Sequence, residues 1–183
     1  MLFYFYTDLL NKLKFSEAGL NTYTIVYCSD NRGASPLGVS IYSLFKHSGY
    51  RTAYKVYVLS NGVSAENQEL ITRLAKGELI RHSINFIDIS CWAATAELPV
   101  TAQWPKTAWS RIFIPNLLPQ ESGVILYLDI DTLVCQDLSD LFVTPLNGNS
   151  IGVVLEHISH EGSHFNERLN IPLCCPGYFN SGV

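Results

Sequence analysis

The sequence has few charged residues and no cluster of basic ones. Its 183 residues include 12 Lys and Arg against 16 Asp and Glu, which gives a formal net charge of −4. The basic residues are scattered along the chain rather than gathered in runs. Proteins that bind nucleic acid usually present clustered cations to the phosphates. We therefore predict that nucleic acid is not a partner.

Long apolar stretches are also missing. No uninterrupted apolar run reaches the roughly 18 residues needed to span a bilayer. The first residues are apolar but include Asp8, and they lack the basic segment and the small-residue cleavage site of a signal peptide. No CxxC spacing occurs among the cysteines, which are Cys28, Cys91, Cys135, Cys174 and Cys175. Free thiols in a reducing compartment are the simplest interpretation, so we expect a soluble, cytoplasmic protein.

Segments typical of strands alternate with segments typical of helices. Apolar and β-branched runs predict strands at residues 22–27, 54–59, 84–89, 124–128, 151–155 and 178–183. Helical spacing of apolar residues predicts helices at 37–47, at 64–77 and, interrupted at Pro115, at 107–118, with a helical turn at 137–142. Residues 91–103 and 157–176 have no clear period and are expected to be loops. Such alternation indicates an α/β sandwich with a largely parallel sheet.

The most informative segment is an apolar run that ends in two acids. Residues 124–128 are apolar, and Asp129 and Asp131 follow with one apolar residue, Ile130, between them. If the strand continued through them, residues i and i+2 would point to the same side, and both carboxylates would face one way. Paired carboxylates at the carboxyl end of a strand suit a hard divalent cation beside a phosphate-bearing ligand. We therefore predict a metal site at Asp129 and Asp131.

A second polar segment follows the first predicted strand. Ser29, Asp30, Asn31, Arg32 and Gly33 form a turn-like sequence directly after an apolar run. Ligands of parallel α/β sheets bind outside the carboxyl ends of the strands. We therefore expect this turn and the paired acids to lie at the same edge of the sheet.

Three segments, in this order and spacing, resemble glycosyltransferase family 8. They are TIVYCSDN, then TAWSRIFIPNLLP running into YLDIDTLVCQDLSDLF, and finally FNSGV. This family includes bacterial lipopolysaccharide galactosyl- and glucosyltransferases and the glycogenins. The resemblance implies a GT-A fold, an α/β/α sandwich with a mostly parallel mixed sheet. It implies an N-terminal extension at residues 1–21 and a catalytic domain at 22–183 that is incomplete at its carboxyl end.

The same resemblance implies a function. Members transfer a hexose from a UDP-sugar to a saccharide or glycolipid acceptor with retention of anomeric configuration, using Mn²⁺ or Mg²⁺. With a glycolipid acceptor, we would expect the protein to associate peripherally with a membrane. The cation would neutralise charge on the departing diphosphate.

Site residues are carried over by position. Asp129, Ile130 and Asp131 match the DxD motif, whose two acids bind the metal and through it the diphosphate. The first loop, which holds uracil and ribose, corresponds to Cys28, Ser29, Asp30 and Asn31, with Asp30 expected to accept the uracil N3–H. Arg111 matches an arginine that contacts phosphate or sugar through its fork of donors. Glu156 matches an acid near the sugar and acceptor, and the segment bordering the anomeric centre corresponds to Asn180, Ser181 and Gly182.

The sequence departs from the family pattern in two places. The aromatic residue that usually follows the first-loop acid and stacks on uracil is replaced by Asn31, Arg32 and Gly33. The family's QDxxLN-type segment and the histidine that completes its metal site have no counterpart here. One alternative is therefore a truncated, catalytically inactive remnant that still binds a nucleotide sugar. A phosphatase of the haloacid-dehalogenase type fits less well, because Thr132 follows Asp131 without the residue that its motif needs between them.

Each site residue also has a purely structural interpretation. The two acids could be a loop start and a helix cap, and Asp30 could bind the N–H groups of its own turn. Arg111 could pair with a surface carboxylate, and Glu156 could simply be solvated. The histidines His157, His160 and His164 could form a zinc site, but they lie in an irregular segment without paired cysteines.

Overall fold

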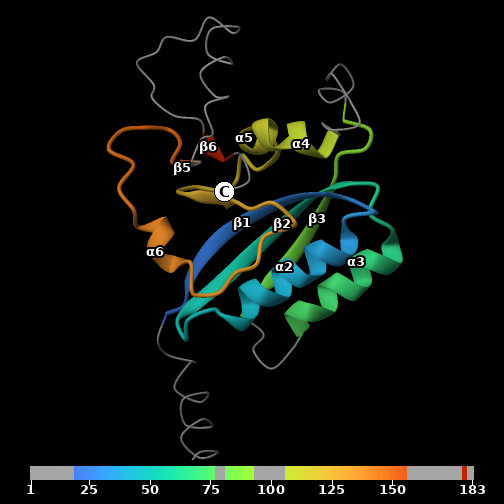
Figure 1. Ribbon diagram of the computed structural model, residues 1–183, viewed down its shortest axis with the longest axis horizontal. Coiled ribbons are helices and arrows are strands. Elements are labelled where there is room, and N and C mark those ends of the chain that lie inside the picture. Colours follow the sequence, from blue (N-terminus) through green and yellow to red (C-terminus); the bar gives the residue numbers. More distant parts are fainter. Residues whose placement is uncertain (1–18, 77–80, 93–105, 156–178, 181–183) are drawn as a thin grey trace, which may run out of the picture.

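A parallel sheet with helices on both faces forms the centre of the molecule (Figure 1). The computed structural model describes residues 19–76, 81–92, 106–155 and 179–180. The strands are β1 (Asn21–Asp30), β2 (Thr52–Asn61), β3 (Ser83–Asp88), β4 (Ile125–Tyr127), β5 (Val154–Leu155) and β6 (Phe179–Asn180). The helices are α2 (Ala34–Lys46), α3 (Ala65–Thr72), α4 (Lys106–Ser110), α5 (Ile114–Leu117) and α6 (Ser139–Phe142), with 3₁₀ turns η1 (Arg73–Lys76) and η3 (Arg111–Phe113).

Strands β1 and β2 are the two interior strands of the sheet. The strand order is β3-β2-β1-β4, and every neighbouring pair in it is parallel. Val26 of β1 is level with Tyr127, the last residue of β4, so β4 ends four residues before β1 does and the chain after β4 begins beside the end of β1. The predicted parallel α/β sheet is therefore confirmed. The strands β5 and β6 instead pair antiparallel with each other in a separate two-stranded sheet.

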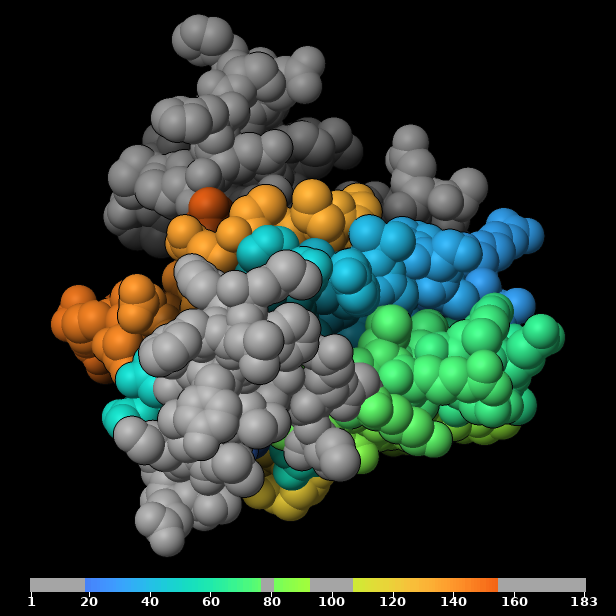
Figure 2. All heavy atoms as spheres, turned by 90° about the horizontal axis from the view of Figure 1, so that it is seen from below, coloured from blue at the N-terminus to red at the C-terminus, as the bar shows by residue number. Residues whose placement is uncertain are grey.

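Alternate residues of the long strands pack into two separate cores. One core lies between the sheet and the α2–α3 face and includes Ile25, Tyr27, Leu37, Ile41, Val56 and Val58. The other lies on the α4–α5 face and includes Val26, Cys28, Leu59, Ile114 and Leu118. Because both faces are covered, β1 and β2 are almost continuously buried, as strands of parallel sheets are. The predicted α/β/α layering is confirmed, and Figure 2 shows α2 and α3 side by side on one outer face.

The predicted helix at 107–118 is broken, but before its proline. Helix α4 ends at Ser110, the 3₁₀ turn η3 follows, and α5 begins at Ile114. Pro115 lies in the first turn of α5, where a missing N–H removes no helical hydrogen bond. The break therefore lies at residues 111–113. None of the helices in the described ranges has the length and apolar character required to cross a lipid bilayer.

Candidate functional site

The loop after β1 is stabilised by Asp30, the last residue of that strand, which runs three residues beyond its predicted end at Tyr27. Asp30 Oδ1 accepts hydrogen bonds from the backbone N–H groups of Arg32 and Gly33, both at 3.0 Å. These groups lie at the start of α2, so the carboxylate shapes the turn that leads from β1 into the helix. The structural interpretation of Asp30 is therefore confirmed. Its Oδ2 has no hydrogen bond to the described part of the chain, which leaves one oxygen for a ligand.

Cys28 and Ser29 place their side chains inside the protein. Both are buried on opposite faces of β1, and Ser29 Oγ donates to the Asp30 carbonyl at 2.9 Å. Burial raises the pKa of the Cys28 thiol to about 12, so it is uncharged at neutral pH. Any contact that these two residues make with a ligand would therefore use backbone atoms.

Asn31 connects this loop to the next βα unit. Its Oδ1 accepts from the Ser64 backbone N–H and from Asn67 Nδ2, both at 2.9 Å. Ser64 is the N-cap of α3, and its Oγ accepts from the Asn67 N–H at 3.3 Å, as the sequence predicts for this helix start. Asn31 therefore fixes the loop after β1 against the loop after β2.

The two acids of the DxD motif lie in a turn and not in a strand. Strand β4 ends at Tyr127, and the Asp129 carbonyl accepts from the Thr132 backbone N–H at 3.2 Å, which closes a turn over residues 129–132. The prediction that the two acids lie in extended strand geometry is therefore wrong. Asp131 is exposed, and its carboxylate has no hydrogen bond or ion pair to the described part of the chain.

Asp129 is held by two neighbours. Tyr127 donates its hydroxyl proton to Asp129 Oδ1 at 2.5 Å, and Arg111 Nη2 lies 3.4 Å from the same oxygen. Burial raises the pKa of Tyr127, which keeps the hydroxyl protonated as a donor. Both neighbours approach Oδ1, so Oδ2 has no partner among the described residues.

Arg111 supplies a positive charge beside the DxD turn. It begins η3, donates from Nε to the Ala108 carbonyl at 2.8 Å, and places its guanidinium 4.6 Å from the centre of the Tyr127 ring. The interpretation that Arg111 pairs with a carboxylate is confirmed, and its partner is an acid of the DxD motif. A guanidinium beside the paired acids provides positive charge where a phosphate would bind.

The loop after β1 and the DxD turn are in direct contact. A methyl group built on Gly33 would lie 2.5 Å from Ile130 Cδ1 and 2.7 Å from Ser29 Oγ. Gly33 therefore has no side chain because Ile130, the middle residue of the DxD motif, occupies that space. The expectation that both segments lie at one edge of the sheet is confirmed by this contact and by the pairing of β1 with β4.

The remaining predicted site residues are placed only in part. The backbone of Asn180 pairs with Val154 in the β5–β6 sheet. Three predicted site residues lie outside the described residues: Glu156, Ser181 and Gly182. The three histidines discussed as a zinc site also lie outside them. Among the described residues, no group of three or more His, Cys, Asp and Glu is arranged to hold a metal.

Sequence reasoning missed Tyr127 and Gly33. Tyr127 and Asp129 are two residues apart where β4 runs out, so the alternation of an extended chain could have predicted that they share a side. The requirement for glycine at position 33 follows from a residue 97 positions later in the chain, and no local pattern reveals it.

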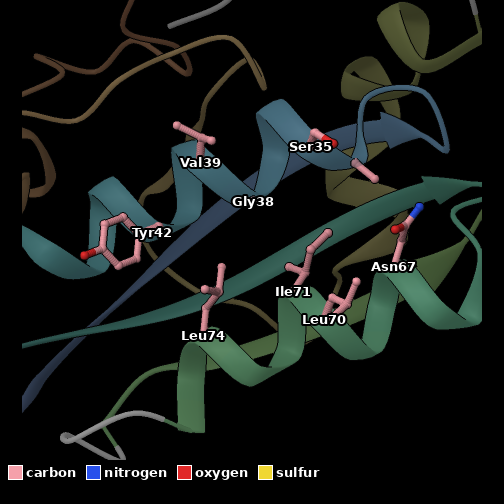
Figure 3. A pocket seen from close by; sticks show the side chains of 9 residues that line it. Ser35, Gly38, Val39, Tyr42, Asn67, Leu70, Ile71 and Leu74 are labelled. Carbon is pink, nitrogen blue, oxygen red and sulfur yellow. The ribbon is translucent and has the colours of Figure 1, made fainter.

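A shallow groove lies elsewhere, between α2 and α3 (Figure 3). It has a volume of about 400 Å³ and is lined mainly by apolar side chains, among them Val39, Tyr42, Leu70, Ile71 and Leu74. The groove has no carboxylate, imidazole or cation among its lining residues. Because Asp30, Asp129, Asp131 and Arg111 lie where β1 and β4 end, we place the candidate site there.

The comparisons with known proteins give a consistent result. Residues 24–183 match the family described as Glycosyl transferase family 8. The lipopolysaccharide 1,2-glucosyltransferase of Escherichia coli (strain K12) is 27% identical over 182 residues, which covers 96% of this chain and 52% of that protein. General stress protein A of Bacillus subtilis (strain 168) is 26% identical over 160 residues, or 87% of this chain and 54% of that protein.

Solved structures agree with this relationship. The galactosyltransferase LgtC, in complex with donor and acceptor sugar analogues, superposes with a TM-score of 0.71 at 25% identity, covering 87% of this chain and 55% of that one. The apo structure of the bifunctional WbbM superposes with a TM-score of 0.73 at 24% identity, over 90% of this chain and 32% of that one, and shows the fold alone. The predicted GT-A fold is thereby confirmed.

The chain spans about half the length of the curated relatives it matches. The family match nevertheless covers all but its first 23 residues. The parallel sheet, the DxD turn and the adjoining first loop all lie within the matched region. This chain belongs to glycosyl transferase family 8.

Proposed function

We propose that this chain binds a UDP-hexose together with Mn²⁺ or Mg²⁺ and transfers the hexose to a saccharide or glycolipid acceptor with retention of configuration. The observation that carries the proposal is the contact between the DxD turn and the loop after β1. A cation at the turn and a nucleotide base at the loop would then be neighbours, as the diphosphate and the base of one UDP-sugar require. This is the crevice outside the carboxyl ends of parallel strands where ligands of α/β sheets bind.

The residues present fit a hard divalent cation. Asp131 is exposed, and Asp129 has an oxygen without a partner among the described residues, so two carboxylates are available. Carboxylate oxygens suit Mn²⁺ and Mg²⁺, and such ions commonly complete their shells with water and substrate phosphate. When bound, the cation would act as a Lewis acid on the departing diphosphate.

The proposed roles of Arg111 and Asp30 follow from their positions in the structure. Arg111, held beside Asp129, would direct N–H donors of its guanidinium to a phosphate or to the donor sugar. Asp30 would accept the uracil N3–H through Oδ2, because Oδ1 already bonds the turn. We assign Glu156, Asn180, Ser181 and Gly182 to the surroundings of the sugar, on the family pattern alone. A cytoplasmic location and peripheral association with a membrane belong to the same proposal.

Calorimetric titration of UDP into the protein tests this function. We expect binding in the presence of Mn²⁺ and its loss when EDTA is added. A cooperative thermal transition by circular dichroism establishes that the protein is folded under the same conditions. Absence of binding by the folded protein would refute the proposal. With binding established, release of UDP from UDP-galactose or UDP-glucose in the presence of Mn²⁺ measures turnover.

Substitution of Gly33 by alanine tests the contact between the two loops. The new methyl group would displace Ile130 from its present position, because both need the same space. The neighbouring atoms are side-chain ends that can rotate, so we expect stability to change by only about 1 kcal/mol. We expect the affinity for UDP in the presence of Mn²⁺ to fall about tenfold. The displacement of Ile130 would misplace the binding groups of the DxD turn, and misplaced groups bind a ligand poorly.

The double variant Gly33→Ala, Ile130→Val provides the control. It removes the methyl group of Ile130 that the new side chain would meet, so part of the affinity should return. Isothermal titration and urea unfolding of the two variants measure both effects. Wild-type affinity in the single variant would show that the contact does not shape the binding site.

A further inference from the structure

Three hydroxyl groups form a chain that ends at the DxD turn. Tyr27 Oη lies 3.1 Å from Ser40 Oγ, and Ser40 Oγ lies 3.1 Å from Thr132 Oγ1. Thr132 Oγ1 in turn lies 2.7 Å from the carbonyl oxygen of Asp129. The chain starts in β1, passes through α2 and reaches the turn that carries both acids. Tyr27 and Ser40 are fully buried, so water does not replace the bond between them, whereas Thr132 is partly buried.

The direction of each hydrogen bond follows from counting protons. A carbonyl oxygen can only accept, so Thr132 must donate its single hydroxyl proton to Asp129. Thr132 then has only lone pairs for Ser40, so Ser40 donates to Thr132. By the same reasoning Tyr27 donates to Ser40. All the donors point toward the turn, an arrangement in which each bond polarises the next.

A second serine of the same helix holds the segment that follows the turn. Ser43 Oγ accepts from the backbone N–H of Val134 at 2.9 Å and donates to the Ser40 carbonyl at 2.7 Å. Ser40 and Ser43 are three residues apart, so they lie on the same face of α2. Helix α2 therefore binds the DxD segment at Thr132 and again at Val134.

We propose that Ser40 of α2 and Thr132 are positioning residues, which together fix the turn of Asp129 and Asp131 in the geometry that holds the metal. This inference rests on the proposed function, because it assigns a purpose to the turn only if the turn binds a cation. Asp131 has no bond of its own to the described part of the chain, so the position of its carboxylate depends on the backbone of the turn. That backbone is held by Thr132, whose N–H and hydroxyl both bond the Asp129 carbonyl.

The test compares Thr132→Val with Thr132→Ser. Valine keeps the shape of the side chain without its hydroxyl, whereas serine keeps the hydroxyl. With valine, Ser40 loses its acceptor and the Asp129 carbonyl loses one of its two hydrogen bonds. We expect the Mn²⁺ concentration that half-saturates UDP binding to rise about tenfold in the valine variant. The serine variant should stay within about threefold of wild type.

Two measurements separate positioning from general destabilisation. Electron paramagnetic resonance of free Mn²⁺ gives the metal affinity, and calorimetry at saturating Mn²⁺ gives the UDP affinity, which should change less than about twofold. A loss of folded protein would lower the amplitude of binding without shifting the half-saturating metal concentration. Ser40→Ala should raise the half-saturating metal concentration in the same way. Thr144→Val is the matched control, because Thr144 Oγ1 bonds the Asp140 carbonyl at 2.9 Å away from the turn.

Each outcome has a definite meaning. A shifted metal affinity in Thr132→Val, restored in Thr132→Ser and absent in Thr144→Val, supports the positioning role. Wild-type metal affinity in Thr132→Val, when the wild-type protein binds Mn²⁺ and UDP, overturns that role and leaves the proposed function standing. If the wild-type protein binds no Mn²⁺ with UDP, the proposed function fails and the positioning role falls with it.

Discussion

Substitution of Asp131 by asparagine is expected to lower Mn²⁺-dependent UDP affinity by more than about 100-fold. Loss of an outer-shell partner of a metal ligand already costs about 10–100-fold, so loss of a direct anionic ligand should cost more. The carboxylate of Asp131 is exposed and has no partner in the described part of the chain. We therefore expect the free energy of unfolding to change by no more than about 0.5 kcal/mol. Calorimetric titration with UDP and Mn²⁺, together with urea unfolding, measures the two quantities.

Asp140→Asn is the control for this substitution. Asp140 is also an exposed aspartate and lies nine residues later, in α6. The Asp140→Asn substitution removes the same charge from the same region of the chain, so a general electrostatic effect on an anionic ligand would appear in both variants. Full Mn²⁺-dependent binding by the Asp131 variant would place the metal elsewhere. Asp129 is the less informative position, because its loss would also release Arg111 and Tyr127.

The fold follows from sequence patterns because the patterns are local. Runs of β-branched and aromatic residues predicted β1, β2 and β3 nearly at their observed bounds, and Ser64 marked the start of α3. A strand buried on both faces needs an unbroken apolar run, and β1 and β2 each contain one, whereas the partly exposed edge strand β3 has Asn85 between Ile84 and Phe86. Their alternation with helices then fixes a parallel sheet with few alternatives.

The sequence suggested candidate site residues but not their geometry, because that geometry depends on distant residues. The motif pointed to Asp129 and Asp131, yet β4 ends at Tyr127 and the chain turns. That turn is held by Thr132 and by its bond to Ser40, 92 residues away, which no spacing along the chain encodes. The pairing of Arg111 with Asp129 likewise requires the sheet that brings η3 beside β4.

Among the proposed substitutions, Asp137→Ala should lower the free energy of unfolding the most, by about 2–3 kcal/mol. Asp137 Oδ2 accepts from the Gly49 backbone N–H, and Oδ1 accepts from the Ser139 N–H at 2.8 Å. Tyr54 Oη, which is 3.5 Å from Oδ2, also accepts from the Leu138 N–H at 3.0 Å. The carboxylate therefore joins the start of α6 to the turn between α2 and β2, and its removal leaves several donors without an acceptor.

Asp88→Ala is the control for the local part of this interaction. Asp88 Oδ1 accepts from the N–H of Ser90, two residues later, just as Asp137 accepts from Ser139. It has no bond to a distant segment among the described residues, so its loss should destabilise the protein much less. Urea unfolding of both variants at neutral pH measures the difference. Equal losses would show that the bond from Gly49 contributes nothing.

The pH dependence of stability gives a second test of Asp137. Burial raises the pKa of this carboxyl, but hydrogen bonds from Ser139, Gly49 and Thr52 outweigh it and lower the pKa from 3.8 to about 2. A carboxyl whose folded pKa is lowered stabilises the protein fully above the unfolded pKa, and this contribution is lost as pH falls from about 4 to 2. Burial and nearby Arg81 lower the pKa of His82 from 6.5 to about 4. The loss of stability that this histidine causes therefore falls in a separate pH window, between 6.5 and 4. Asp137→Asn should therefore reduce the loss of stability between pH 4 and 2 and leave the loss between pH 6.5 and 4 unchanged. If the free energy of unfolding fell equally steeply between pH 4 and 2 in the variant and in the wild type, the role assigned to this carboxylate would be contradicted.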